Sequence, residues 1–342
     1  DGFDITEANF TGIFRNINTL IGGTGSDTLN GANIALTWTI NGTSNQVTDG
    51  AKTLAFSAIE TVNGGSAIDT FNINSTPTIN LNGGAGDDVF NFAAGSLLTG
   101  VIDGQGGSDT FSYASFNASV TATLNTIGAT DGFNGTASGL NGTFANIDAL
   151  VGSTASDTLN GANLTSSWKF EVGSLKLEVG SSTFTFSAIE IINGGTSDDT
   201  FTVADGVTFN GSLNGGAGSD TLSYAGNAAN RSVTLTSLGA TDGFNGTASA
   251  IANGFSNINN VVGGNGGDTM TGLNSDATWN ILGANSGNYV NTNTLTFSAI
   301  DNLVGGNGVD TISYSTYTTS VTVNLTLGTA TSLTSISAIE NV

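Results

Sequence analysis

The residue types that could do chemistry in this chain are almost all carboxylates. Nine aspartates end a six-residue turn that begins with glycine, as in GGAGDD at 83–88 and GGAGSD at 215–220. These nine are Asp27, Asp69, Asp88, Asp109, Asp157, Asp199, Asp220, Asp268 and Asp310. A carboxylate at such a turn can accept backbone N–H bonds, or it can bind a hard cation that prefers oxygen ligands.

Composition removes most other chemistry. The 342 residues carry a formal net charge of −22, with no His, no Cys and only five Lys and Arg. Imidazole bases, thiolate nucleophiles and the usual zinc ligands are therefore excluded. The chain offers no basic surface for nucleic acid or anionic lipid, and no apolar run of about 18 residues that would span a membrane.

The turns recur at three spacings, which indicate a repeat protein. Successive aspartates of the set are 42, 19, 21, 48, 42, 21, 48 and 42 residues apart. We interpret these spacings as one or two units of about 20 residues. Larger repeats are also visible, because GATDGFNGTAS occurs at 128–138 and 239–249, and each Trp follows its Asp by 11 residues. We expect one continuous array over 1–342, with superrepeats 1–130, 131–241 and 242–342, as a segment of a longer chain.

The elements that must position these turns are short strands. Apolar residues alternate with polar ones before and after each turn, as at Leu54/Phe56 and Phe90/Phe92. Period two predicts strands with one buried face. Phe56, Ile59 and Val62 break that period, which places a corner near Ala58. We predict an all-β fold, a right-handed parallel β-solenoid of about 16 coils of roughly 20 residues. The rival fold is an array of three β-sandwich domains, which would not explain the unit of about 20.

The glycine turns resemble a known family. GGTGSD (22–27), GGAGDD, GGAGSD, GGNGGD (263–268) and GGNGVD (305–310) are similar to the RTX nonapeptide GGxGxDxUx, in which U is large and apolar. The resemblance implies a secreted, usually bacterial protein with Ca²⁺ held between stacked turns. The chain departs from the family because its turns are isolated rather than in tandem. As a whole it resembles giant bacterial surface proteins built of tandem β-strand repeats.

Adjacent coils would place some of the carboxylates close together. Asp69, Asp88 and Asp109 would stack on successive coils, as would Asp199 and Asp220, so we take these five as candidate Ca²⁺ ligands. Two carboxylates about 4.8 Å apart repel by about 4 kcal/mol at an effective dielectric of 20, which a cation would relieve. Asp27, Asp157, Asp268 and Asp310 have equivalents two units away and form a second set, less suited to sharing an ion. The alternative is that Asp closes each turn by hydrogen bonds alone.

These features favour a non-catalytic structural protein of the bacterial cell exterior. We expect a segment or subunit of an extracellular filament, sheath, surface layer or adhesin stalk, and no enzyme. Its partners would be further copies or further chain, joined through stacked solenoid ends. A glycan- or ice-binding adhesin module is the alternative, because strand threonines recur in TFTFS (183–187) and TLTFS (294–298). A polysaccharide lyase or epimerase fits less well, because such enzymes use basic residues.

Overall fold

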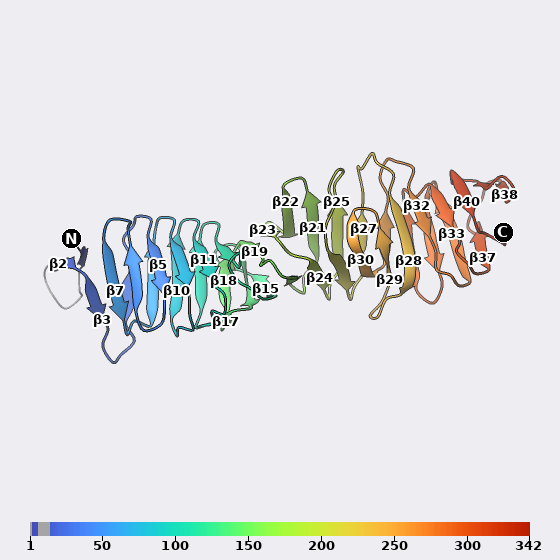
Figure 1. The fold of residues 1–342 in the computed structure, drawn as a ribbon. Helices are drawn as coiled ribbons and strands as arrows, with labels where there is room; N and C mark the ends of the chain where they lie inside the picture. The colour runs from blue at the N-terminus through green and yellow to red at the C-terminus, as the bar shows by residue number, and fades with distance from the viewer. Residues whose placement is uncertain (1, 6–13) are drawn as a thin grey trace. The chain divides into compact units, whose positions relative to one another are not determined.

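The fold consists of short strands in long sheets. A computed structural model describes residues 2–5 and 14–342, and these contain no helix (Figure 1). Residue 1 and residues 6–13 of the expected array lie outside the described residues. The chain divides into two compact units, the first containing 1–159 and 181–189 and the second containing 160–180 and 190–342. The prediction of an all-β solenoid is confirmed.

The first unit contains two sheets. Its first sheet has the strand order β3 (Thr19–Ile21), β7 (Thr53–Ser57), β6 (Asn45–Thr48), β5 (Thr37–Ile40), β9 (Thr70–Ile73), β11 (Val89–Phe92), β14 (Thr110–Ser112), β19 (Ala149–Val151) and β23 (Ser182–Ser187). Its second sheet has the order β4 (Thr28–Asn30), β8 (Thr61–Gly65), β10 (Asn80–Ala85), β13 (Ile102–Gly106), β18 (Phe144–Ile147), β16 (Phe133–Ala137) and β15 (Thr121–Ile127). The chain alternates between these sheets, so each passage through both makes one coil.

The second unit repeats this plan. Its first sheet has the order β22 (Ser174–Val179), β21 (Ser166–Glu171), β25 (Asp199–Val203), β27 (Thr221–Ser223), β31 (Asn260–Val262), β35 (Thr294–Ser298), β34 (Ser286–Val290), β33 (Ala277–Gly283) and β37 (Asp310–Ser313). Its second sheet has the order β24 (Ile191–Gly195), β26 (Ser212–Gly216), β30 (Ile251–Ile258), β29 (Phe244–Ala248), β28 (Ser232–Leu238), β32 (Thr269–Thr271), β36 (Asn302–Val304) and β40 (Ser335–Ser337).

Four short strand pairs and single strands complete the topology. These are β1 (Phe3–Ile5) with β2 (Phe14–Ile17), β12 (Leu98–Thr99) with β17 (Leu140–Asn141), β38 (Val323–Asn324) with β39 (Thr329–Ala330), and β20 (Thr158–Asn160). The division between the two units falls within β20.

Uniform parallel coils occur only where the aspartates are about 20 residues apart. Strands β9, β11 and β14 pair in parallel, with Phe71, Phe90 and Phe111 in register. The spacings of 42 and 48 are different, because there the chain folds back into an antiparallel meander. The expected array of about 16 equal coils is corrected in this respect.

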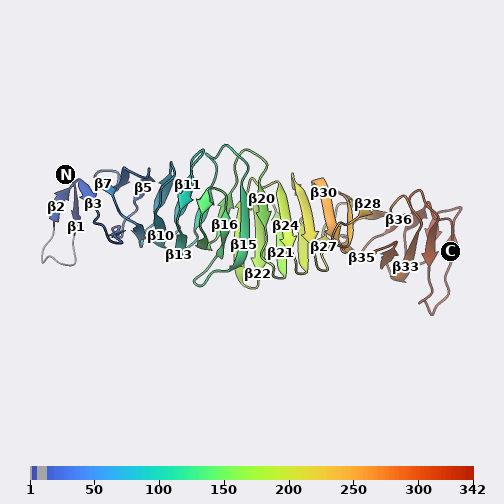
Figure 2. The ribbon, with the colours of Figure 1, turned by 90° about the horizontal axis from the view of Figure 1, so that it is seen from below.

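The meanders alternate between the two sheets. In the first sheet they are β5–β6–β7 and β33–β34–β35, and each lies within a spacing of 42. In the second sheet they are β15–β16–β18 and β28–β29–β30, and each lies within a spacing of 48. Strands β15 and β16 lie side by side in Figure 2. Because the two sheets gain extra strands in turn, parallel coils can resume after each meander.

The core lies between the two sheets of each unit. Trp38, Trp168 and Trp279 are fully buried, as the alternating pattern predicts. In the first unit the rings of Phe71 and Phe90 stack with centroids 4.9 Å apart, while the Phe111 ring meets Phe144 of the opposite sheet at 5.1 Å. Burying such rings is the main favourable contribution to folding, and aromatic pairs add about 0.5–1.5 kcal/mol each.

The corner predicted near Ala58 is confirmed, and it has an unusual backbone. Ala58 has φ of 51°, in the left-handed region. Its equivalents share this conformation: Asn16, Asn146, Ala188, Asn257, Ala299 and Ala338 have φ between 48° and 56°. Asn adopts this conformation readily, whereas Ala does so at a cost of about 1–2 kcal/mol. The corner therefore explains why Asn alternates with Ala at this position of the repeat.

Candidate functional site

The nine turn aspartates occupy two different edges of the solenoid. We call the crossings from the first sheet to the second the first edge, and the crossings from the second sheet to the first the second edge. Asp27, Asp157 and Asp268 lie on the first edge. Asp69, Asp88, Asp109, Asp199, Asp220 and Asp310 lie on the second edge. Asp310 is thus grouped by the structure with Asp69 and Asp199, although its spacing placed it with the first-edge set.

On the second edge each carboxylate binds the backbone of the neighbouring coil. The Asp69 N–H donates to Oδ1 of Asp88 at 2.7 Å, and the Asp88 N–H donates to Oδ1 of Asp109 at 2.8 Å. In the second unit the Asp199 N–H donates to Oδ1 of Asp220 at 2.9 Å. The sequence-predicted sets therefore do lie on adjacent coils. They are joined through main-chain donors, so one oxygen of each acceptor carboxylate is already used.

Ladder carboxylates also explain the first glycine of each turn. A Cβ at Gly104 would lie 2.3 Å from Oδ2 of Asp109 and 2.2 Å from the carbonyl oxygen of Asn146. A Cβ at Gly83 would lie 2.3 Å from Oδ2 of Asp88. No side chain fits at these distances, so glycine five residues before the aspartate is required by close approach.

The other carboxylate oxygen of the second edge is buried without a partner. Oδ2 has no hydrogen-bond partner in Asp69, Asp88, Asp109, Asp199, Asp220 and Asp310, and these residues are 0–1% exposed. Burial is the main cause that raises their pKa values, to about 6 for Asp69, Asp199 and Asp310 and to about 7 for Asp88, Asp109 and Asp220. This second oxygen can therefore hold a proton or face a cation.

First-edge carboxylates use both of their oxygens. Oδ2 of Asp268 accepts the N–H of Gly264 in its own turn at 2.5 Å, and Oδ1 accepts the N–H of Arg231 in the neighbouring coil at 2.6 Å. Asp157 accepts from Ser153 at 2.5 Å and from Val120 at 2.6 Å in the same way. These aspartates are turn-closing residues, with no oxygen left over for an ion in the plane of these bonds.

A second row of polar residues accepts the N–H of the turn aspartates. It occupies the position two residues after the left-handed corner. The acceptors are Glu60 for Asp27 (2.8 Å), Asp148 for Asp109 (3.0 Å), Asn259 for Asp220 (3.1 Å), Asp301 for Asp268 (3.0 Å) and Glu340 for Asp310 (2.8 Å). The repeated acidic residue of FSAIE is thus a cap for the next turn rather than a free surface charge.

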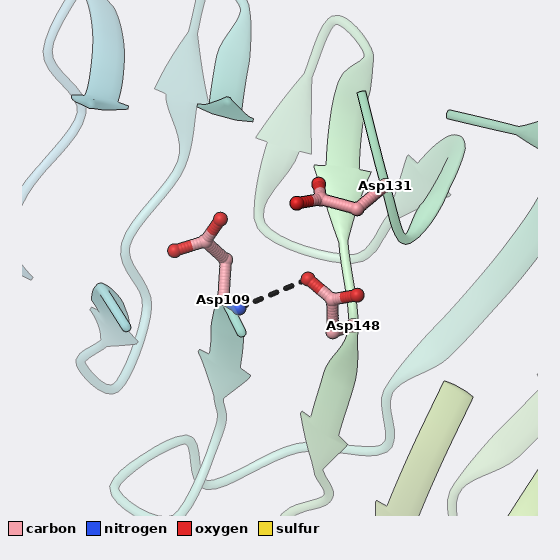
Figure 3. A group of neighbouring side chains, drawn as sticks. All are labelled: Asp109, Asp131 and Asp148. Atoms are coloured by element: carbon pink, nitrogen blue, oxygen red, sulfur yellow. Dashed lines mark hydrogen bonds between the residues drawn. The ribbon is translucent and has the colours of Figure 1, made fainter. Parts of the chain in front are cut away.

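Three carboxylates come together at one place in the first unit. One oxygen from each of Asp109, Asp131 and Asp148 lies within 4.8 Å of the others, a group that could hold a metal ion. In Figure 3 the Asp131 carboxylate faces that of Asp109, and Asp148 accepts the Asp109 N–H from the neighbouring coil. Oδ2 of Asp131 accepts the Gly107 N–H at 3.1 Å, while its Oδ1 is buried without a partner.

Of this triad, only Asp109 was among the candidates predicted from the sequence. Asp131 lies in the loop between β15 and β16, and Asp148 lies between β18 and β19, so the meander brings both to Asp109. A signal for Asp131 does exist, because the string GATDGFNGTAS gives it an equivalent in Asp242. Asp148 is the acidic position of the corner signature, and its role depends on which coil lies next to it.

The second unit contains the same arrangement with one change. The Gly218 N–H donates to Oδ2 of Asp242 at 3.2 Å, as Gly107 does to Asp131. The Asp220 N–H donates to Oδ1 of Asn259 at 3.1 Å, as Asp109 does to Asp148. The backbone scaffold is therefore retained, but an amide replaces the third carboxylate.

Fold and site together define a repetitive two-sheet β-solenoid protein whose turns are closed by carboxylates. No protein-family model matches the chain, and no curated protein matches it. Within residues 2–5 and 14–342, no helix is long and apolar enough to cross a membrane.

Proposed function

We propose that this chain is a non-catalytic structural protein of the bacterial cell exterior. It would be a segment or subunit of a filament, sheath, surface layer or adhesin stalk. The observation that carries the proposal is the use of the repeated polar residues. The turn aspartates and the corner acids are hydrogen-bonded to backbone N–H groups of their own or neighbouring coils. Residues repeated for this purpose build a scaffold, and a scaffold of stacked coils can be extended without limit.

Rows of asparagine support the same interpretation. In the second sheet of the first unit, the Asn63 amide donates to Asn30, and the Asn82 amide donates to Asn63 at 2.7 Å. In the second unit, Asn214 donates to Asn193 at 3.2 Å, and Asn257 donates to Asn214 at 2.7 Å. Side-chain ladders of this kind add bonds between successive strands along the sheet.

The proposed partners are further copies of the chain or further chain. Strand β3 pairs only with β7, and β37 pairs with β33 and makes one bridge through Thr311 to Asn341. Each of these strands has backbone groups on its other side that can pair with an added strand. We therefore propose self-association or continuation through stacked solenoid ends.

Calcium is the ion that we propose for the carboxylate sites. The resemblance of the glycine turns to RTX repeats supports it, as does the oxygen-only ligand supply of a chain without His or Cys. A melting experiment tests this part separately. We expect the midpoint to rise in Ca²⁺ relative to EDTA, because an ion that binds only the folded state stabilises it. Equal midpoints would remove calcium and leave the structural function in place.

Location is the most direct test of the structural function. Antibodies raised against the chain should label intact producing cells, and immunogold electron microscopy should place the label on extracellular material. Permeabilised cells serve as the matched control. Labelling that appears only after permeabilisation would contradict the proposal.

A further inference from the structure

We propose that Asp109, Asp131 and Asp148 form a single binding site for a hard divalent cation, Ca²⁺ or Mg²⁺. The inference deepens the calcium part of the proposed function, on which it rests, by naming one site out of many carboxylates. It also predicts that the corresponding group in the second unit, Asp220, Asp242 and Asn259, is not such a site.

Geometry and burial carry the assignment. The three carboxylates each bring an oxygen within 4.8 Å of the other two. Asp109 is 0% exposed, its Oδ1 is used by the Asp88 N–H, and its Oδ2 has no partner. Oδ1 of Asp131 is likewise buried without a partner. A buried carboxylate oxygen without a partner is costly, and a shared cation would satisfy both of these oxygens.

No cationic side chain offsets the charge of this group. The five ion pairs of the described residues involve Asp4, Glu171, Glu178 and Asp205 as the acids, and none of the triad. Burial raises the pKa of Asp109 to about 7, and the carboxylates of Asp88, Asp148 and Asp131 raise it further. The site therefore favours a bound positive charge.

Water can reach the triad to complete the coordination. A groove of about 470 Å³ is lined by Asp131, Asp148, Ser108 and Thr130, together with hydroxyls of 181–185. All of the polar side chains in this set offer oxygen ligands. Ca²⁺ takes six to eight oxygen ligands and Mg²⁺ usually keeps several waters, so an open site with three carboxylates suits both.

The second unit supplies a natural control for the third carboxylate. Asn259 keeps the hydrogen bond to the backbone of the neighbouring coil, so the fold accepts Asn at this position. Its Oδ1 is the atom used in that bond, and its Nδ2 cannot bind a cation. The two groups thus differ by one negative charge on an otherwise equivalent scaffold.

Isothermal titration calorimetry of the full chain with CaCl₂, repeated with MgCl₂, tests the site. Salt at about 150 mM limits diffuse binding to the acidic surface. The variants are Asp148→Asn, which copies the second unit, and Asn259→Asp, which copies the first. We expect one site in the wild type, loss of that site in Asp148→Asn, and a second site in Asn259→Asp. Circular dichroism confirms that each variant is folded.

Three results would overturn the site assignment. They are no saturable binding by the wild type, equal binding by the wild type and folded Asp148→Asn, or no gain in folded Asn259→Asp. Calcium-dependent melting that persists unchanged in Asp148→Asn would uphold calcium binding elsewhere in the chain while rejecting this site. The structural function does not depend on any of these outcomes, because it is tested by location.

Discussion

The two edges of the solenoid use the same Gly–x4–Asp signature in different ways. On the first edge, Asp268 closes its own turn with one oxygen and caps the neighbouring coil with the other. On the second edge, Asp220 caps the neighbouring coil with Oδ1, while Oδ2 stays buried without a partner. A single sequence motif therefore produces a fully satisfied carboxylate on one edge and a half-satisfied, protonatable one on the other.

The largest expected difference between the edges lies in the second glycine of the turn. Gly84 on the second edge has φ of 113°, and a Cβ there would lie 1.9 Å from the carbonyl oxygen of Gly65. We expect Gly84→Ala to lower the free energy of unfolding by about 3 kcal/mol or more, because strain and overlap add. Chemical denaturation monitored by circular dichroism measures the loss.

The matched control is Gly23→Ser on the first edge. Gly23 has an ordinary φ and no atom within 3.4 Å of a built Cβ, and Ser153 stands at the equivalent position. We expect a change below about 1 kcal/mol. A loss as large as that of Gly84→Ala would show that the two turns are not different.

Amide substitution separates the two kinds of carboxylate. Asp268→Asn replaces one of two accepting oxygens by an N–H donor that faces another donor, so we expect a loss of about 2 kcal/mol. Asp220→Asn keeps Oδ1 as acceptor and replaces an oxygen that has no partner, so we expect a change within about 0.5 kcal/mol at acid pH. Thermal melts of both variants at one pH give the comparison. Equal losses would reject the distinction between the edges.

Stability should depend on pH through the second edge. Burial, and secondarily the charges of Asp199, Asp242 and Asp198, raise the pKa of Asp220 from 3.8 to about 7. The folded state then holds a proton that the unfolded state releases. The contribution of this group is complete below about pH 4, is lost as the pH rises, and is gone above about pH 7.

Melting midpoints from pH 4 to 8 in EDTA check this sign. We expect the wild type to lose stability relative to Asp220→Asn as the pH rises through this range. Parallel curves for the two proteins would show that Asp220 does not titrate with a raised pKa.

The smallest effect concerns the corners next to both edges. Ala188 has φ of 52°, a conformation that Asn adopts at the equivalent positions 146 and 257. We expect Ala188→Asn to stabilise the chain by up to about 1 kcal/mol, since Asn tolerates the left-handed region better than Ala. Denaturant midpoints measure it, with Ala145→Asn, outside the left-handed region, as the control. Destabilisation by Ala188→Asn would contradict the account of the corner.

The repeated strands were predictable because their signal is local. Alternation at Leu54/Phe56 and Phe90/Phe92 marks the buried face, and all four residues are buried. The break at Ile59 marks the corner. The antiparallel meanders were not predictable in the same way, since pairing direction depends on which strands meet. Spacings of 42 and 48 resemble two coils of about 20, and only the pairings of β6 and β16 show the reversal.

The candidate site was predictable only in part, for the same reason. Adjacent placement of Asp69, Asp88 and Asp109 follows from their spacing, and the structure shows it. The meeting of Asp109 with Asp131 and Asp148 depends on the meander between them, which brings residues 22 and 39 positions further along the chain back to one edge.

Hydrogen exchange of the ladder amides tests most directly the claim that carboxylates join successive coils. The N–H groups of Asp69, Asp88 and Asp199 each donate to an aspartate of the next coil. The account predicts that they exchange as slowly as amides of the paired strands, with the 81% exposed hairpin residue Val172 as the fast reference. Exchange of these three amides as fast as that of Val172 would contradict it.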